Sequence, residues 1–217
     1  MKFKGVIFDL DGTLLDTIED LSDSMNAVLE EKGLPVHPVN SYKIFVGDGV
    51  EVLVERALPE KYRMDKLFLE DCVEKMRFIY NKNSRNKTKP YKGIPELLNE
   101  LKKKGYRMGI LSNKPDDATQ SVVQHYFEPG LFDSVIGRKP EYPKKPAPDG
   151  ALKVMRDLGL SPEEVFYLGD TSTDMQTAVG AGFFPAGALW GFRGAEELIE
   201  HGARAIFKNP ADIIPML

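Results

Sequence analysis

The chain has 217 residues, 42% of them hydrophobic, which is enough for one α/β domain with a smaller insertion. Its formal net charge is −4, from 29 basic and 33 acidic residues, so it has no electrostatic footprint for nucleic acid. Cys72 is the single cysteine, which excludes an internal disulfide and favours a reducing compartment. Neither a signal segment nor a long apolar stretch is visible, so we expect a cytoplasmic protein without a membrane partner.

The first structural signal is a short apolar run, Val6–Phe8, followed by Asp9, Leu10, Asp11 and Gly12. An apolar run of this length closed by a breaker indicates a buried strand. Asp-Gly is also frequent in hairpins, but the next residues lead into a helix rather than a returning strand. Because ligands bind outside the carboxyl ends of strands in an open parallel sheet, the two carboxylates lie where catalytic groups are useful.

The segment that follows is predicted to be helical. Apolar residues at helical spacing predict a helix that begins near Thr17, a plausible N-cap, and ends at Gly33. No strand is predicted between residues 16 and 89. Two further helices are predicted over 50–58 and 64–80, and the polar segment 81–89 is predicted to be a linker or hinge.

Strands and helices then alternate to the end of the chain. Predicted helices cover 95–104, 116–126, 149–158, 173–181 and 195–201, and predicted strands cover 106–111, 134–136, 165–168, 184–189 and 205–207. This alternation predicts an α/β fold with a parallel sheet and helices on both faces, the three-layer core of Rossmann-like folds. We expect residues 1–15 and 90–217 to form this core and residues 16–89 to form a small helical domain with hinge segments.

Polar residues stand at three later points of this alternation. Ser112-Asn113-Lys114 follows a strand and could hold phosphate oxygens, although the same residues are ordinary in turns. Lys145 precedes Pro146-Ala147-Pro148, which stiffens the backbone before a helix, although a lone Lys-Pro is more often a solvated loop. Asp170 and Asp174, four residues apart after a strand, suit Mg²⁺, although either could simply cap the next helix.

The order acid–acid, hydroxyl, lysine, acid–acid at four successive strand ends resembles the haloacid dehalogenase-like superfamily of phosphatases. The resemblance covers the whole chain. Its most specific part is Asp9-x-Asp11-Gly12-Thr13-Leu14-Leu15-Asp16, followed by Gly169-Asp170-x-x-x-Asp174. The helical insertion resembles the cap of one large branch, and within it Phe45–Leu58 is similar to phosphoglycolate phosphatases.

The resemblance implies a role for each matching residue. Asp9 would be the nucleophile, and Asp11 would give a proton to the leaving group and take one from water. Mg²⁺ would be held by Asp9, the main-chain carbonyl of Asp11, and Asp170, with Asp174 nearby. Phosphate would be bound by Gly12, Thr13, Ser112, Asn113 and Lys145, with Ser112 and Lys145 also counted as catalytic. The expected specificity residues of the cap are Lys43, Gly47, Asp48 and Gly49. A simple loop at a helix start explains the two glycines and Asp48 equally well, and an exposed lysine is more often only a solvated charge.

The sequence thus predicts a Mg²⁺-dependent phosphatase that hydrolyses a small phosphorylated metabolite, with 2-phosphoglycolate as the best guess, and acts as a monomer or weak homodimer. The alternatives are a β-phosphoglucomutase-like phosphomutase, or a phosphatase for another sugar phosphate, a nucleotide or pyrophosphate.

A dehalogenase does not need the acid at Asp11. A receiver domain is shorter and lacks the helical insertion, and a binding protein with a silent site would not keep every candidate residue.

Overall fold

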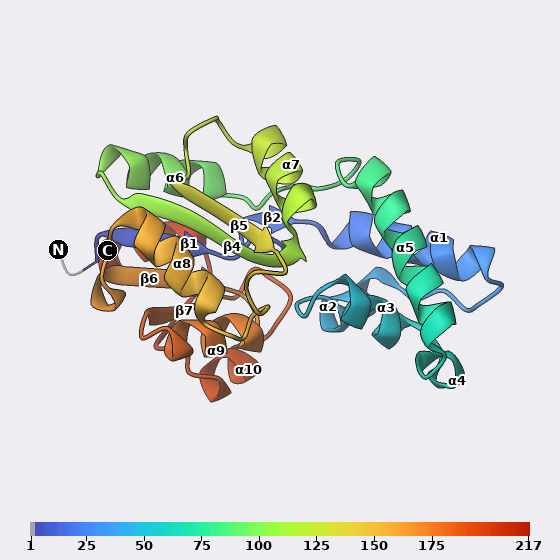
Figure 1. The fold of residues 1–217 in the computed structure, drawn as a ribbon. Helices are drawn as coiled ribbons and strands as arrows, with labels where there is room; N and C mark the ends of the chain where they lie inside the picture. Colours follow the sequence, from blue (N-terminus) through green and yellow to red (C-terminus); the bar gives the residue numbers. More distant parts are fainter. Residues whose placement is uncertain (1–2) are drawn as a thin grey trace. The chain divides into compact units, whose positions relative to one another are not determined.

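The core of the protein is a six-stranded parallel sheet in a computed structural model that describes residues 3–217 (Figure 1). The strand order is β5-β4-β1-β6-β7-β8, and every neighbouring pair is parallel. The strands are β1 (Gly5–Phe8), β4 (Arg107–Pro115), β5 (Ser134–Arg138), β6 (Val165–Gly169), β7 (Phe184–Ala188) and β8 (Ala205–Phe207). The predicted α/β fold with a parallel sheet is therefore confirmed.

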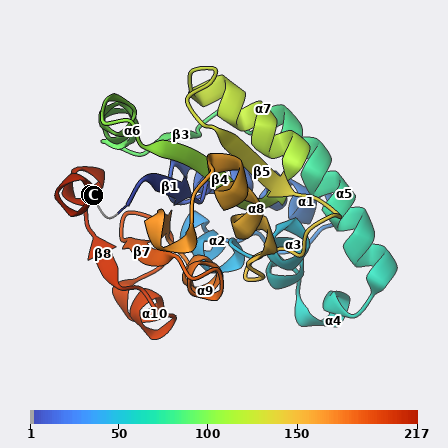
Figure 2. The same cartoon turned by 60° about the vertical axis from the view of Figure 1, so that its left-hand side comes forward.

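Both faces of this sheet are covered, which explains why its central strands are continuously apolar. Side chains alternate along β1, so Val6 and Phe8 enter one core cluster and Ile7 enters the other. The first cluster includes residues of α6 (Ile94–Lys103), α7 (Asp116–Tyr126) and the 3₁₀ helix η2 (Pro210–Met216). The second includes residues of α8 (Asp149–Leu158) and α9 (Ser172–Gly180), as the rotated view helps to follow (Figure 2). The core therefore has three layers.

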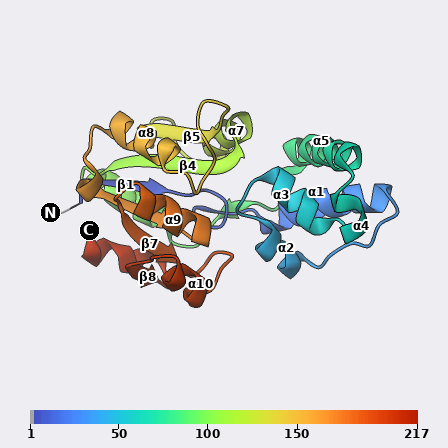
Figure 3. The same ribbon diagram turned by 60° about the horizontal axis from the view of Figure 1, so that its bottom comes forward.

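Residues 17–89 form a separate helical unit. Its helices are α1 (Ile18–Glu31), α2 (Val39–Phe45), α3 (Val50–Ala57), α4 (Glu60–Arg63) and α5 (Lys66–Asn83). The two long helices, α1 and α5, pack against each other (Figure 3). Met25 and Val28 of α1 and Val73 and Met76 of α5 are buried, as expected for amphipathic helices that share a core.

The chain divides into two compact units by its internal contacts. One joins the residues up to Asp16 with Pro90–Leu217, and the other is Thr17–Lys89. Two short strands, β2 (Leu15–Asp16) and β3 (Lys89–Pro90), pair with each other where the chain passes between the units. No helix among residues 3–217 is long and apolar enough to cross a bilayer.

Several local predictions for the helical segment were wrong. The strands β2 and β3 were missed because two residues give no periodic signal, and α2 was missed because Tyr42 is its single buried residue. The predicted linker starts too early, because α5 continues to Asn83. Thr17 stands at the N-cap of α1, but its buried hydroxyl has no hydrogen-bond partner within residues 3–217.

Candidate active site

The turn after β1 brings Asp9 to the edge of the sheet. The Asp9 N–H donates to the Leu168 carbonyl at 2.9 Å and so continues the pairing of β1 with β6 by one residue. The chain then turns tightly, and Gly12 adopts a φ of +97°. A Cβ on Gly12 would lie 2.3 Å from Oδ2 of Asp170, so the turn requires glycine for both conformation and space.

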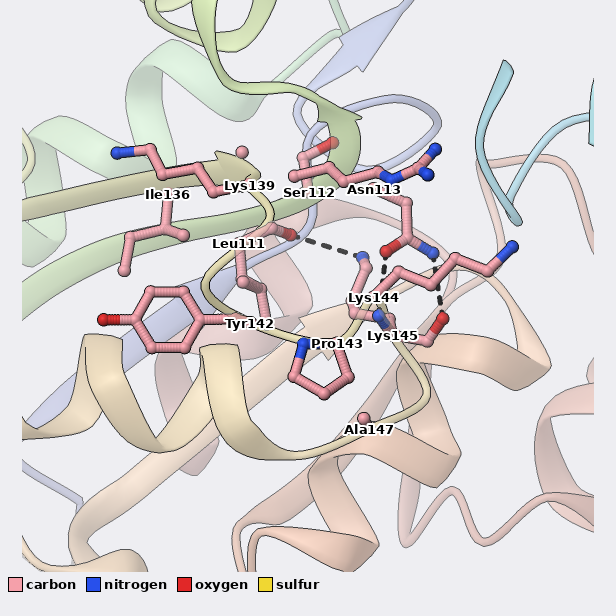
Figure 4. Close-up of a pocket in the computed structure, with 12 residues that line it drawn as sticks. Leu111, Ser112, Asn113, Ile136, Lys139, Tyr142, Pro143, Lys144, Lys145 and Ala147 are labelled. Atoms are coloured by element: carbon pink, nitrogen blue, oxygen red, sulfur yellow. Dashed lines mark hydrogen bonds between the residues drawn. The ribbon is translucent and has the colours of Figure 1, made fainter. Parts of the chain in front are cut away.

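A buried ion-pair triad joins the end of β1, the loop before α8 and the first turn of α9. Lys145 Nζ lies 2.6 Å from Asp9 Oδ1 and 2.7 Å from Asp174 Oδ1, and it donates to the Leu111 carbonyl at 3.2 Å (Figure 4 shows this last bond). All three donors of the ammonium are thus used. Asp9 Oδ2 accepts no hydrogen bond from any side chain or backbone group of residues 3–217. Lys145, which the resemblance assigns to phosphate binding, thus also contacts two of the predicted acidic residues.

Asp170 is completely buried and held through both of its oxygens. The Thr13 hydroxyl donates to Oδ1 at 3.1 Å, and the Phe192 N–H donates to Oδ2 at 2.7 Å. The Trp190 indole N–H donates to the Thr13 carbonyl at 2.9 Å. The loop that follows β7 therefore supports Asp170 directly, through Phe192. Through Trp190 the same loop also supports the turn after β1.

Asp174 has two roles: it caps α9, and it belongs to the acidic cluster. Its Oδ2 accepts hydrogen bonds from the N–H and hydroxyl of Thr171, at 3.1 and 2.7 Å, and so completes a capping box for α9. Its Oδ1 faces Lys145 and also accepts from the Tyr167 hydroxyl at 3.3 Å. The Asp174 side chain therefore caps α9 with one oxygen and contacts Lys145 with the other.

Burial dominates the electrostatics of the cluster. Burial, together with the Asp174 and Asp11 charges, outweighs the Lys145 ammonium and raises the pKa of Asp9 to about 7. Burial, with the charges of Asp9 and Asp174, also raises the pKa of Asp170 well above its ordinary value. Burial by itself would lower the pKa of Lys145, but the Asp174 and Asp9 carboxylates raise it well above the ordinary value.

This donor set fits a hard divalent cation. Carboxylate oxygens of Asp9, Asp170 and Asp174 lie within 4.8 Å of one another, and all three residues are buried. Lys145 offsets one of the three negative charges, which leaves a surplus that a divalent ion would neutralise. Oxygen ligands of this kind are those that Mg²⁺ prefers, so the residues present suit the predicted metal.

The sequence interpretation missed Lys114. Its Nζ lies 2.9 and 3.0 Å from the two Asp11 oxygens, and its side chain is only 5% exposed. The sequence offered no signal for this contact, because Ser112-Asn113-Lys114 has an equally good explanation as an ordinary turn. The two predicted catalytic aspartates are thus paired with different lysines, Asp9 with Lys145 and Asp11 with Lys114.

The predicted phosphate-binding residues fall into two groups. Ser112 and Asn113 are buried at the end of β4, and the Ser112 hydroxyl accepts a hydrogen bond from the Lys114 N–H at 3.2 Å. The Gly12 and Thr13 N–H groups already donate to the carbonyls of Leu15 and Leu10, at 2.8 and 3.4 Å. These two N–H groups are therefore engaged within their own turn, whereas the Thr13 hydroxyl serves Asp170.

The predicted specificity residues all lie in the helical unit. Gly47, Asp48 and Gly49 precede α3, and Lys43 is in α2. Asp48 forms an ion pair with Arg56 at 2.7 Å, and Arg56 also donates to the carbonyls of Ile44 and Phe45. Arg56 thereby ties α3 to the end of α2, and the role of this loop in substrate choice stays a prediction.

Comparison with known proteins gives a consistent result. Residues 6–188 match the family model described as haloacid dehalogenase-like hydrolase. A phosphoglycolate phosphatase of Aquifex aeolicus is 35% identical over 86% of this chain and 85% of its own length, and one of Haemophilus influenzae is 31% identical over 100% and 99%. A crystal structure from Lactobacillus delbrueckii subsp. bulgaricus, which carries a provisional phosphoglycolate phosphatase name, is 31% identical, with a TM-score of 0.92 over 98% of this chain and 97% of that one. The chain belongs to the family of haloacid dehalogenase-like hydrolases.

Proposed function

We propose that the protein is a Mg²⁺-dependent phosphatase that hydrolyses a small phosphorylated metabolite through a phosphoaspartyl intermediate, with 2-phosphoglycolate as substrate. The observation that carries the reaction class is the pairing of Asp9 with Lys145 and of Asp11 with Lys114 at one edge of the sheet. Two carboxylates in different environments can take different roles in one reaction. The names of the relatives from Aquifex aeolicus and Haemophilus influenzae support the choice of substrate.

In the first step, a carboxylate oxygen of Asp9 attacks phosphorus, and the bond from phosphorus to the ester oxygen breaks. Oδ2 is suited to this role because Oδ1 is already engaged by Lys145. Asp11 gives its proton to the departing oxygen, which leaves as an alcohol. The product left on the protein is an acyl phosphate at Asp9, so one slow displacement becomes two faster ones.

In the second step, water attacks the phosphorus of the acyl phosphate and gives a proton to Asp11. The bond to Asp9 breaks, inorganic phosphate forms, and both aspartates return to their starting states. Lys145 holds the Asp9 side chain in place in both steps. Mg²⁺, when bound by Asp9, Asp170 and the Asp11 carbonyl, would offset the repulsion between nucleophile and phosphate. Acid–base catalysis by Asp11 supplies only about 10²–10⁴-fold, so charge neutralisation must supply much of the rest.

A cytoplasmic location and a monomeric or weakly dimeric state stay predictions from the sequence. Cys72 is buried and free, so the fold is not stabilised by a disulfide, which supports a reducing compartment.

A phosphate-release screen with and without Mg²⁺ tests the proposal. The panel should contain 2-phosphoglycolate, sugar phosphates, nucleotides and pyrophosphate. We expect Mg²⁺-dependent release, with kcat/KM for 2-phosphoglycolate at least ~10-fold above the other compounds, which corresponds to ~1.4 kcal/mol. A higher value for another phosphate would reject the substrate and keep the reaction class. Transfer of the phosphoryl group to a second hydroxyl, rather than to water, would identify a mutase instead.

Asp9→Asn tests the nucleophile. An amide cannot form the acyl phosphate, so we expect kcat to fall by at least ~10³-fold while the fold is kept. The matched control is Asp117→Asn, the same change at an exposed position of α7, for which we expect the activity of the parent protein. Asp11→Asn should also lower kcat, because both steps lose their proton carrier. Near-normal turnover of Asp9→Asn would reject the mechanism.

A further inference from the structure

Asn113 lies in an irregular stretch of β4. The pairing of β4 with β5 shifts register between Leu111 and Pro115, so the three residues 112–114 escape regular ladder geometry. Each of their side chains serves a different purpose. The Ser112 hydroxyl accepts from the Lys114 N–H, the Lys114 ammonium contacts Asp11, and the Asn113 amide turns toward Lys145.

The Asn113 amide pairs with the backbone of Lys145 at two points. Its Oδ1 accepts from the Lys145 N–H at 2.9 Å, and its Nδ2 donates to the Lys145 carbonyl at 3.1 Å (Figure 4). Both residues are 5% exposed. An amide side chain offers one donor group and one acceptor side by side, so it can pair with a residue's backbone as a neighbouring strand does. An aspartate of the same shape lacks the donor.

Lys145 needs such support because it does not belong to a helix or strand. It lies in the loop between the end of β5 at Arg138 and the start of α8 at Asp149, and its neighbours Lys144 and Pro146 are exposed. A lysine side chain has many rotamers, so it keeps one position only when its contacts hold it there. Here the ammonium end is fixed by Asp9, Asp174 and Leu111, and the backbone end is fixed by Asn113.

We propose that Asn113 is a positioning residue for Lys145, which sets the place of the cation that neutralises the Asp9 nucleophile. The proposal concerns the side-chain amide of Asn113 and is independent of phosphate binding by its backbone. The Asn113 amide links the end of β4, where Ser112 lies, to the loop before α8. The Ser112 hydroxyl, predicted to bind phosphate, and the Lys145 ammonium therefore keep a fixed separation. The catalytic consequence rests on the proposed phosphatase function, whereas the pairing of Asn113 with Lys145 does not.

Asn113→Ala removes both hydrogen bonds. We expect kcat to fall ~10–100-fold, the range seen when a group that orients an active-site residue is lost, with KM changed by less than ~3-fold. Asn113→Asp keeps the volume and the acceptor but places a second oxygen against the Lys145 carbonyl, so its loss of kcat should be at least as large. The control is Asn99→Ala, on an exposed position of α6, which should keep the parent kcat. A kcat within ~2-fold of the parent for both Asn113 variants would overturn the proposal.

A double-mutant cycle with Lys145→Met separates positioning from a general structural effect. If Asn113 acts through Lys145, adding Asn113→Ala to Lys145→Met should lower kcat by less than ~3-fold further. Multiplying losses would overturn the proposal.

Hydrogen exchange of the Lys145 backbone amide gives a readout that needs no turnover. We expect slow exchange in the parent protein and in Asn99→Ala, and at least ~10-fold faster exchange in Asn113→Ala. If exchange in Asn113→Ala were unchanged, the pairing would be overturned, whether or not the protein hydrolyses a phosphate ester. If exchange followed the expected pattern but no phosphate ester were hydrolysed, only the proposed function would be rejected.

Discussion

At the scale of single residues, the candidate site depends on the space left free around Asp170. Glycines stand at two places where a Cβ would clash with this carboxylate. A Cβ on Gly12 would lie 2.3 Å from Asp170 Oδ2, and a Cβ on Gly191 would lie 2.4 Å from the Cβ and from Oδ2 of Asp170. Because the next N–H, that of Phe192, donates to Oδ2, any shift of this loop also moves the proposed metal ligand.

Gly191→Ala should therefore weaken Mg²⁺ binding. The added methyl group forces Asp170 or the loop to move, and displacement of groups that orient a metal ligand typically costs about 10–100-fold in metal affinity. The measurement is the Mg²⁺ concentration needed to raise the thermal midpoint Tm, compared with the same protein in chelator. Gly194→Ala is the matched control, because a Cβ at Gly194 meets no atom within 4 Å. Equal Mg²⁺ responses of the two variants would contradict this account of Gly191.

Single residues also show what the sequence could and could not predict. Asp9 and Asp170 stand in compact motifs, so their type and spacing were enough to select them. The contacts of Lys114 with Asp11 and of Asn113 with Lys145 span 103 and 32 residues of the chain. They depend on an irregularity in β4 that leaves no compositional trace, and Ser-Asn-Lys has an equally good explanation as an ordinary turn.

At the scale of secondary-structure elements, long periodic helices were predictable and short or irregular pieces were not. The helix α1 has a regular apolar face, whereas α2 buries only Tyr42 and gives no period. The last part of the predicted linker is bound to α1, which the sequence did not predict. Asp20 is 1% exposed and binds the backbone of Lys87 and Thr88, a contact over 67 residues that polar composition cannot reveal. The segment after α5 is thus tied to α1.

Asp20→Ala should destabilise the protein by about 2–4 kcal/mol. Its carboxylate accepts from the Lys87 N–H at 3.0 and 3.1 Å, from the Thr88 N–H at 2.9 Å and from the Thr88 hydroxyl at 2.7 Å. Removing the acceptor leaves partly or fully buried donors without this partner, at about 1–3 kcal/mol each. The free energy of urea unfolding measures the loss.

Asp23→Ala is the control for this prediction. Asp23 lies less than one turn further along α1 and contacts the same lysine, but only through an exposed ion pair with Lys87 Nζ at 2.7 Å. Such a pair contributes about 0–1 kcal/mol, so the control should lose no more than that. Equal losses for the two variants would show that the segment is held by surface charge rather than by the buried hydrogen bonds.

At the scale of the whole molecule, folding gathers carboxylates that the unfolded chain keeps apart. Asp9, Asp170 and Asp174 come from two strand ends separated by 161 residues along the chain (9 to 170), and all three become buried together. Lys145 is the cation within this cluster, and burial still raises the pKa values of Asp9 and Asp170. The arrangement therefore stores electrostatic repulsion in the metal-free protein, which a bound cation would relieve.

This repulsion predicts how stability depends on pH. Because burial raises the pKa of Asp9 to about 7 and that of Asp170 well above its ordinary value, the native state binds more protons than the unfolded state above pH 4. The free energy of unfolding must then fall as pH rises from about 4 through the raised pKa values of the two carboxyl groups. In chelator, Tm should be lower at pH 8 than at pH 5, and Mg²⁺ should raise Tm more at pH 8, where the carboxylates must be charged. Asp170→Asn removes one charge, so it should flatten both the pH dependence and the response to Mg²⁺. A metal-free Tm that rises between pH 5 and pH 8 would show that the cluster does not carry unrelieved negative charge, and would remove the electrostatic reason for a metal at this edge of the sheet.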